Sequence, residues 1–295
     1  MMSTKTNRLT LIDKFRRAIG RRVSFNPKHF VPEVLYHYTT AAGFEAILGS
    51  RRLRATNFSF LNDPSEVQYG REMVEQALID RLNTKGRRHR AFFEFVVSGF
   101  SAEMAAEVYV CCFTKLEDDL SQWRAYGSAT GERYAIGFDS EALDGLARPS
   151  AGAFFHQVEY ELTDQQARID EVLDRSVTFL DEHHVPISQV SHFSEATARR
   201  LAGIMPVLKN PAYRREEEWR IVVWSTVGAE RPKFDTARGV VRPYMQFSLG
   251  EPLPVVALYV MAPARREVAL KAAAMVLSGA RVNVTPEHSN IPFAE

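Results

Sequence analysis

The chain has only two cysteines among its 295 residues, and these are neighbours, Cys111 and Cys112. They lie inside the apolar run VYVCCFT, and no second pair of cysteines stands at a zinc-binding spacing. A disulfide framework and a structural zinc site therefore have no basis in the sequence. We expect two thiols in the protein core and no bound metal.

Long apolar runs are also missing. No run approaches the roughly 18 to 20 residues that a membrane-spanning helix requires. The apolar residues between Leu9 and Phe15 are interrupted by Asp13 and Lys14, which argues against the core of a signal peptide. The composition, 45% hydrophobic and 25% charged, is typical of a globular protein. We therefore expect a cytoplasmic protein without a transmembrane segment.

Several common cofactor and catalytic motifs are absent. No glycine-rich run ends in Gly-Lys-Ser/Thr, so a P-loop is excluded. The segment GSATG, residues 127–131, lacks the GxGxxG spacing of a dinucleotide-binding fold. No G-x-S-x-G elbow accompanies a candidate catalytic triad. Any chemistry must therefore come from residues outside these motifs.

The net charge of +1 hides an uneven distribution. Residues 1–32 carry eight Lys or Arg against Asp13 alone, which gives 8 − 1 = +7 and leaves 1 − 7 = −6 for the rest. We interpret residues 1–33 as a basic helical arm. It either packs on the domain or contacts nucleic acid, an anionic membrane or an acidic partner protein. The apolar residues at helical spacing in it are Leu9, Ile12, Phe15 and Ile19.

The remaining residues, 34–295, predict a single α+β domain with helical insertions. The expected helices follow the 3.6-residue period, and the expected strands are apolar or alternating runs. The helices are expected near 41–49, 64–82, 91–100, 164–182, 194–208 and 265–278. The strands are expected at 34–40, 53–57, 108–114, 133–139, 155–162, 216–225, 240–249, 255–261 and 281–285.

One histidine stands at the end of an expected strand, VLYHYTT. Alternation places Leu35 and His37 on one face of this strand and Tyr36 and Tyr38 on the other. The strand feeds a strand–helix–strand unit, so His37 stands where a pocket could open. It is either a ligand-binding residue or a hydrogen-bonded core histidine.

Two further stretches concentrate acidic residues. In EEEWRIVVW, a strand places Glu216, Glu218 and Arg220 on one face, where two carboxylates could stabilise a developing positive charge. The competing interpretation is a surface Glu218–Arg220 salt bridge, which contributes only about 0 to 1 kcal/mol. In FLNDPSE, Asp63 and Glu66 fit a helix-capping box, which also weakens a metal-dependent nuclease hypothesis based on them.

The order of six segments resembles a bacterial family known as a domain of unknown function, number 2971. The resemblance covers nearly the whole chain after about residue 34. The segments are YHYTT, FLNDPSE, CCFTKLEDDLSQWRAYG, RYAIGFD, YRREEEWRIV and SNIPF. That family in turn looks like a divergent ADP-ribosyltransferase, which implies mixed, largely antiparallel sheets of that type with helical insertions.

The second resemblance implies site residues for NAD as a substrate. His37 corresponds to the residue that holds the adenosine ribose, with Thr39 beside it. Glu218 corresponds to the invariant glutamate of the superfamily, and Glu216 to the preceding carboxylate that orients the acceptor. Neither the aromatic that stacks on nicotinamide nor the phosphate-binding arginine is assigned to one position. The aromatic candidates are Tyr38, Trp123 and Tyr126, Asn62 is a further cofactor-binding candidate, and the arginine candidates are Arg52, Arg54 and Arg124.

The resemblance implies an NAD-dependent ADP-ribosyltransferase, or an NAD glycohydrolase where water is the acceptor. A toxin, effector or phage-defence role fits this activity, and the acceptor is a macromolecule, either protein or nucleic acid. The alternative is a non-catalytic module that binds a nucleotide or a protein. The enzyme requires His37 and Glu218 to share one cleft with an aromatic side chain, whereas the module allows Glu218 to be buried against Arg220.

Overall fold

A computed structural model of the chain describes residues 10–20, 32–61, 63–84, 86–103, 108–126, 131–147, 153–225, 231–237, 239–262 and 264–292. The chain divides into two compact units. The helical unit comprises Met1–His29, Pro64–Ala106 and Glu159–Lys209. The sheet unit comprises Phe30–Asp63, Glu107–Val158 and Asn210–Glu295. The arm and two insertions thus form a unit of their own, whereas the sequence analysis divided the chain into an arm and a single domain.

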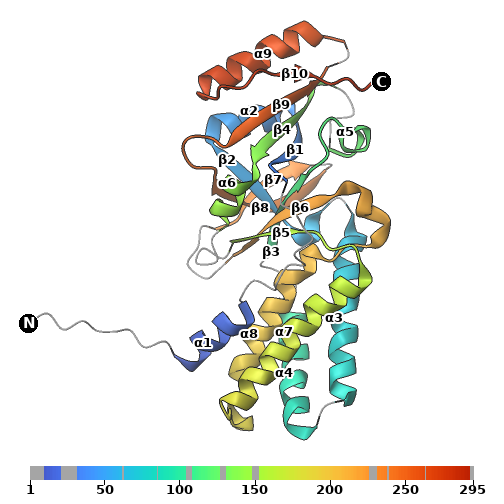
Figure 1. Ribbon diagram of the computed structural model, residues 1–295, viewed down its shortest axis with the longest axis vertical. Coiled ribbons are helices and arrows are strands. Elements are labelled where there is room, and N and C mark those ends of the chain that lie inside the picture. Colours follow the sequence, from blue (N-terminus) through green and yellow to red (C-terminus); the bar gives the residue numbers. More distant parts are fainter. Residues whose placement is uncertain are drawn as a thin grey trace, which may run out of the picture. The chain divides into compact units, whose positions relative to one another are not determined.

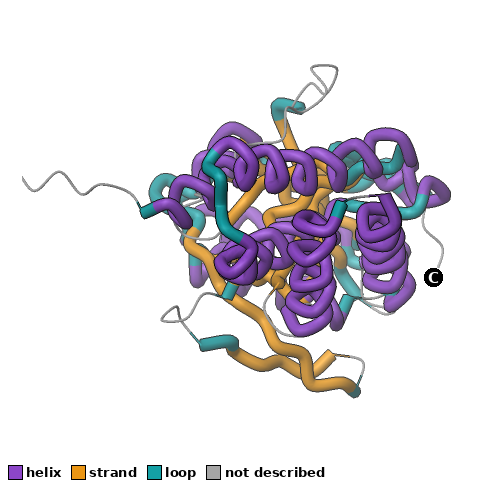
Figure 2. Tube along the Cα trace, turned by 90° about the horizontal axis from the view of Figure 1, so that it is seen from below, coloured by secondary structure: helices purple, strands orange, loops and turns teal. Residues whose placement is uncertain are grey.

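The helical unit consists of helices that run side by side (Figures 1 and 2). None of the described helices of the protein is long and apolar enough to cross a membrane. Glu159 and Leu208 join the ends of the second insertion through an isolated parallel bridge. The elements are α1 (Leu11–Gly20), α3 (Pro64–Thr84), α4 (Arg87–Glu103), α7 (Leu162–Glu182), α8 (Val190–Ile204) and the short 3-10 helices η3 (Ile187–Gln189) and η4 (Met205–Val207).

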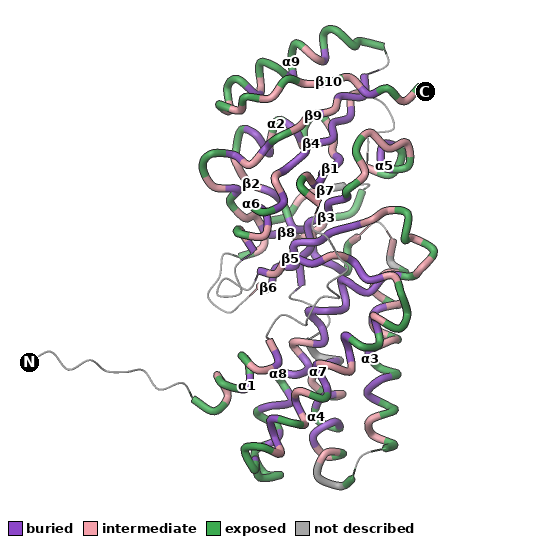
Figure 3. The backbone as a smooth tube through the Cα atoms, in the orientation of Figure 1, coloured by how far each residue is buried: buried purple, intermediate pink, exposed green. Residues whose placement is uncertain are grey.

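The helix of the basic arm packs on this unit through its apolar stripe. Phe15 is fully buried, and its ring lies 5.1 Å from that of Phe179 on α7 and 5.0 Å from that of Phe193 on α8. Ile19, one turn later, is also buried, and Figure 3 shows buried positions recurring along α7 and α8. The basic residues on the other face of α1 are exposed. The predicted amphipathic helix is therefore confirmed over residues 11–20.

The sheet unit is built on one ten-stranded, largely antiparallel sheet, which confirms an α+β fold (Figure 1). The strand order is β10-β9-β4-β1-β3-β2-β8-β7, with β6 pairing both β3 and β5, and β10 is parallel to β9. The strands are β1 (Val34–Thr40), β2 (Arg52–Asn57), β3 (Val108–Thr114), β4 (Arg133–Asp139), β5 (Ala153–Gln157), β6 (Glu218–Trp224), β7 (Lys233–Ala237), β8 (Val240–Ser248), β9 (Val255–Met261) and β10 (Glu287–His288). The helices are α2 (Ala41–Ser50), α5 (Leu120–Tyr126), α6 (Ser140–Leu146), α9 (Arg266–Gly279), η1 (Phe58–Phe60) and η5 (Pro211–Glu216).

Both faces of the sheet around β1 are packed, because its side chains alternate as the sequence predicts. Leu35 joins a large apolar cluster with residues of α2, α6 and α9. Tyr36 and Tyr38 join a smaller cluster with Trp123 of α5. Helices therefore cover one face, and α5 covers the other near the end of β1.

Three sequence predictions about strands are wrong. The expected strand 281–285 is absent, because Arg281 adopts a left-handed φ of 60° and the Val282 amide donates to the Leu277 carbonyl, which closes α9. The short strand β10 follows instead, at Glu287–His288. The strand expected at 155–162 begins and ends earlier, at Ala153–Gln157, and β7 was not predicted.

Candidate functional site

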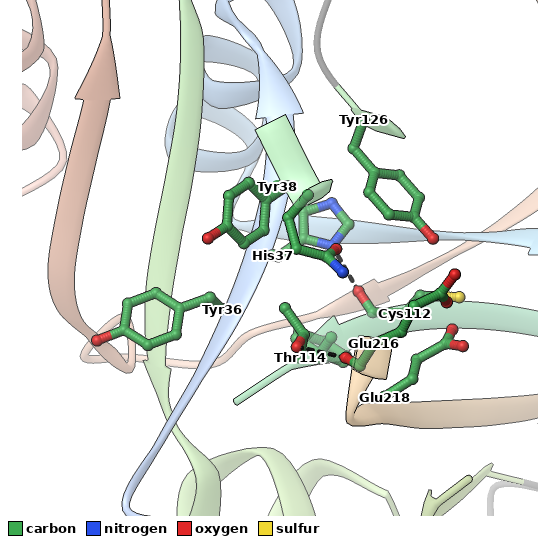
Figure 4. A pocket seen from close by; sticks show the side chains of 10 residues that line it. Tyr36, His37, Tyr38, Cys112, Thr114, Tyr126, Glu216 and Glu218 are labelled. Carbon is green, nitrogen blue, oxygen red and sulfur yellow. Dashed lines mark hydrogen bonds between the residues drawn. The ribbon is translucent and has the colours of Figure 1, made fainter. Parts of the chain in front are cut away.

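One cavity of the sheet unit brings together several of the residues that the sequence singled out (Figure 4). Its volume is about 330 Å³, including the space at its open mouth. Its walls come from β1, β3, α5 and the start of β6. The lining residues are Tyr36, His37, Tyr38, Cys112, Phe113, Thr114, Gln122, Tyr126, Glu216 and Glu218.

The cavity lies where the sheet changes partners. One edge of β3 pairs with β6 along its whole length, from Val108 to Thr114. The other edge pairs with β2 at residues 109–110 and with β1 only at Thr114. Among the described residues, positions 111–113 therefore have no strand partner on that edge. This split leaves the Cys112 carbonyl available to a side chain.

The His37 ring fills part of the split. Its Nδ1 lies 2.9 Å from the Cys112 carbonyl oxygen. Because a carbonyl oxygen only accepts, Nδ1 must carry the hydrogen. Burial lowers the pKa of His37, an effect that this hydrogen bond opposes. In the neutral ring Nε2 is therefore an acceptor, so His37 is both hydrogen-bonded within the sheet and a wall of the cavity.

The two candidate glutamates come from different elements. The strand β6 begins at Glu218, so the predicted strand does not extend back to Glu216. Glu216 ends the 3-10 helix η5, and Glu217 turns the chain with a left-handed φ of 44°. The Thr114 hydroxyl donates to the Glu216 carbonyl at 2.6 Å and fixes this turn against β3. Glu216 and Glu218 line the same cavity (Figure 4).

Glu218 is held by a buried ion pair. Arg220 Nε and Nη2 donate to its two carboxylate oxygens, each at 2.8 Å. The predicted Glu218–Arg220 salt bridge is confirmed, but its side chains are only 4% and 1% exposed, so it is buried and not a surface pair. Residues two apart on a strand share a face, which brings the two groups together. The pair keeps a carboxylate in a fixed orientation at the cavity wall.

Cys112 also lines the cavity, so only Cys111 is confirmed as a core thiol. Strand alternation explains the difference, because neighbouring residues point to opposite faces of the sheet. Burial raises the pKa of the Cys112 thiol well above its usual value, and the hydrogen bond to Glu218 adds to this. The thiol is therefore neutral at physiological pH and a poor nucleophile.

The aromatic candidates have different positions. Tyr126 lines the cavity from α5, and Figure 4 shows its hydroxyl directed toward the carboxylates. Tyr38 lines it too, but its hydroxyl donates to the Leu116 carbonyl and accepts from the Asp119 amide. Trp123 is 1% exposed and packs edge-on against Tyr38 at 4.7 Å, outside the cavity wall. Tyr126 is therefore the aromatic best placed to contact a ligand.

Of the other predicted binding residues, Thr39 does not line the cavity, and it lies on β1 opposite Tyr134. Asn62 lies outside the described residues. Arg54 contacts Asp235 and lies over the Tyr244 ring, 4.7 Å from its centroid. Neither Arg52 nor Arg124 is part of the cavity wall. No arginine candidate for a phosphate contact is thus supported by position.

The two acidic residues of the nuclease hypothesis each have another partner. In the sheet unit, Asp63 accepts from the Tyr213 hydroxyl at 2.8 Å. In the helical unit, Glu66 pairs with the buried Lys209 at 3.0 Å. Among the described residues, no group of three His, Cys, Asp or Glu side chains could hold a metal ion. The structure gives the nuclease hypothesis no support.

A comparison with protein families identifies one matching segment. The family described as "Protein of unknown function (DUF2971)" matches residues 122–221. This match confirms the expected family resemblance over residues 122–221. The matched segment begins on α5 and ends in β6, so it contains the Gln122, Tyr126, Glu216 and Glu218 walls of the cavity. No curated protein and no solved structure shows significant similarity to the chain.

The sequence analysis missed a hydrogen-bonded centre at Asp118, four residues before the matched segment. One carboxylate oxygen accepts from Trp123 Nε1 at 2.9 Å and from the Ser289 hydroxyl. The other accepts from the Asn290 amide at 2.8 Å. Tyr36 adds a bond to Glu117 at 2.9 Å. These hydrogen bonds join three of the segments that carry the family resemblance, YHYTT, LEDDLSQW and SNIPF. Together they fix one loop beside the cavity.

We expect Asp118→Ala to lower the free energy of unfolding by about 2 to 4 kcal/mol, measured by urea denaturation. The change leaves the buried Trp123 N–H without its acceptor and places alanine at a left-handed φ of 41°. Asp118→Asn tolerates that φ and keeps one acceptor oxygen for Trp123 Nε1, so it should lose less stability than Asp118→Ala. Glu75→Ala, on an exposed position of α3, is the control. Equal stability of Asp118→Ala and wild type would contradict this role.

The lowered pKa of His37 makes the unfolding free energy depend on pH. The unfolded ring takes up a proton near pH 6.5, whereas the folded ring does so only at lower pH. The part of the unfolding free energy that depends on His37 is therefore complete above about pH 6.5 and is lost as the pH falls below that value. Between pH 8 and 5 we expect wild type to lose more stability than His37→Gln. If the unfolding free energies of wild type and His37→Gln changed equally with pH, the prediction would be contradicted. The control is His192→Gln, the same change at an exposed position.

Proposed function

We propose that the cavity binds the nicotinamide-ribose half of NAD and that the protein transfers ADP-ribose to a macromolecule or to water. The observation that carries this proposal is that His37, Tyr126, Glu216 and Glu218 line one cavity.

In the proposed reaction the bond between the ribose C1′ and the nicotinamide nitrogen breaks, and its electron pair leaves with nicotinamide. Positive charge develops on the ribose, as in glycoside hydrolysis. A carboxylate about 4 Å away, at an effective dielectric near 20, stabilises that charge by roughly 4 kcal/mol. Glu218 supplies this carboxylate. The acceptor oxygen or nitrogen then bonds to C1′ and loses its proton, for which Glu216 is the candidate base.

The remaining wall residues suit the same substrate. The neutral His37 ring offers Nε2 as an acceptor for a ribose hydroxyl, and the Tyr126 ring offers an aromatic face for nicotinamide. The strand–helix–strand order β1–α2–β2 and a late strand that opens at Glu218 also support an ADP-ribosyltransferase type of fold. No metal enters this scheme.

The second candidate is a non-catalytic module that binds a nucleotide or a protein. The bidentate Arg220–Glu218 pair favours it, because a guanidinium so close offsets the negative charge that the reaction would use. In the module Glu218 is a structural anion, and the cavity recognises a ligand without changing it. The two candidates therefore differ in turnover and not in the presence of a binding site.

The deciding experiment measures nicotinamide release from NAD by the purified full-length chain, alone and with nucleic acid or cell extract. The transferase predicts release that continues over many turnovers. Stabilisation of the protein by NAD against heat, without release, would instead support the module. If the protein neither released nicotinamide nor was stabilised by NAD, both candidates would be overturned for NAD. A transferred label on protein or nucleic acid would separate transfer from hydrolysis.

A further inference from the structure

A buried amide in the cavity wall has no role in the scheme above. Gln122 lies on α5, whose first turn is capped by Asp119: one carboxylate oxygen accepts from the Ser121 amide at 2.9 Å and from the Gln122 amide at 3.2 Å. Gln122 and Tyr126 are four residues apart, so they share one face of the helix. Both line the cavity.

The side-chain amide of Gln122 makes no hydrogen bond to another residue in the described part of the chain. The residue as a whole is 4% exposed and lines the cavity. A cavity-lining amide in this state has its donor and its acceptor available to a ligand.

We propose that Gln122 determines specificity by pairing with a carboxamide of the ligand. This inference rests on the proposed function, in which the carboxamide is that of nicotinamide. Two amides pair reciprocally, because each offers one N–H donor and one C=O acceptor. A ligand carboxylate cannot donate to Gln122 Oε1, and it meets the like charges of Glu216 and Glu218 in the same cavity. The cavity therefore selects an amide over the corresponding acid.

The test compares the binding of NAD and nicotinic acid adenine dinucleotide by calorimetry. We expect wild type to bind NAD at least about tenfold more tightly than the acid. In Gln122→Leu, the dissociation constant for NAD rises roughly 10- to 100-fold, and the preference falls to within about threefold. If the leucine variant does not fold, Gln122→Met replaces it in the same comparison, because methionine keeps the length of the side chain but has no amide. The control is Gln166→Leu, the same change at an exposed position of α7, which should keep the wild-type dissociation constant for NAD and the wild-type preference for NAD over the acid.

The possible failures are distinguishable. A preference for NAD that survives in Gln122→Leu and Gln122→Met overturns the role of Gln122 but leaves the proposed function intact. Binding with the expected preference but without nicotinamide release overturns the transferase and supports Gln122 as the selector of a binding module. Absence of NAD binding by wild type overturns both inferences.

Discussion

Glu218→Gln reduces nicotinamide release from NAD by up to about a thousandfold, if the cavity performs the proposed chemistry. Glutamine keeps the size of the side chain and one acceptor oxygen, but it loses the negative charge. Because Arg220 offsets part of that charge, roughly 4 kcal/mol, or about three powers of ten in rate, is the upper limit of the loss. Because the charge develops only as nicotinamide leaves, we expect the loss in kcat, with KM for NAD changed by less than about threefold.

The neighbouring glutamates provide the controls for this measurement. Glu217 forms an ion pair with Lys115 at 2.6 Å and does not line the cavity, so Glu217→Gln should retain full activity. Glu216→Gln should slow the attack of the acceptor, whether a macromolecule or water, because Glu216 is the candidate base for that step. If Glu218→Gln released nicotinamide as fast as wild type, Glu218 would have no catalytic role, and the ion pair would be its whole function.

The fold could be anticipated wherever a periodic pattern of side chains was long and regular. The strands β1, β3, β4 and β9 were predicted with their bounds or nearly so, because alternation or a continuous apolar run identifies them. The pattern gave no indication that two insertions, residues 64–106 and 159–209, fold together into a helical unit. Contacts between segments so far apart in the chain leave no periodic signal in either of them.

The candidate site was predicted in part, for reasons that differ between residues. His37 and Glu218 stand out by their positions on expected strands, the family resemblance implies their roles, and the cavity brings them together. Gln122 was missed because a single glutamine next to a tryptophan has no distinctive pattern. Its signal, a cavity-lining amide without a partner among the described residues, exists only in three dimensions. The split between β1 and β2 along β3 is likewise a property of pairing, which local sequence does not encode.

Arg220→Met is expected to lower the free energy of unfolding by about 3 to 5 kcal/mol, measured by urea denaturation at pH 7. Methionine fills much of the volume of the arginine side chain but leaves the Glu218 carboxylate, 4% exposed, without its bidentate partner. A loss below about 1 kcal/mol would mean that the pair behaves like an exposed one.

The double variant Arg220→Met/Glu218→Gln separates the net contribution of the pair from the cost of breaking it. Removing both charges should recover much of the stability lost in Arg220→Met, because breaking a buried ion pair costs far more than replacing it with neutral groups. The pair then contributes little net stability. Its effect on the cavity is to hold an ionised carboxylate in one orientation beside a ligand. A double variant as unstable as Arg220→Met would instead assign the arginine to packing and to its other contacts.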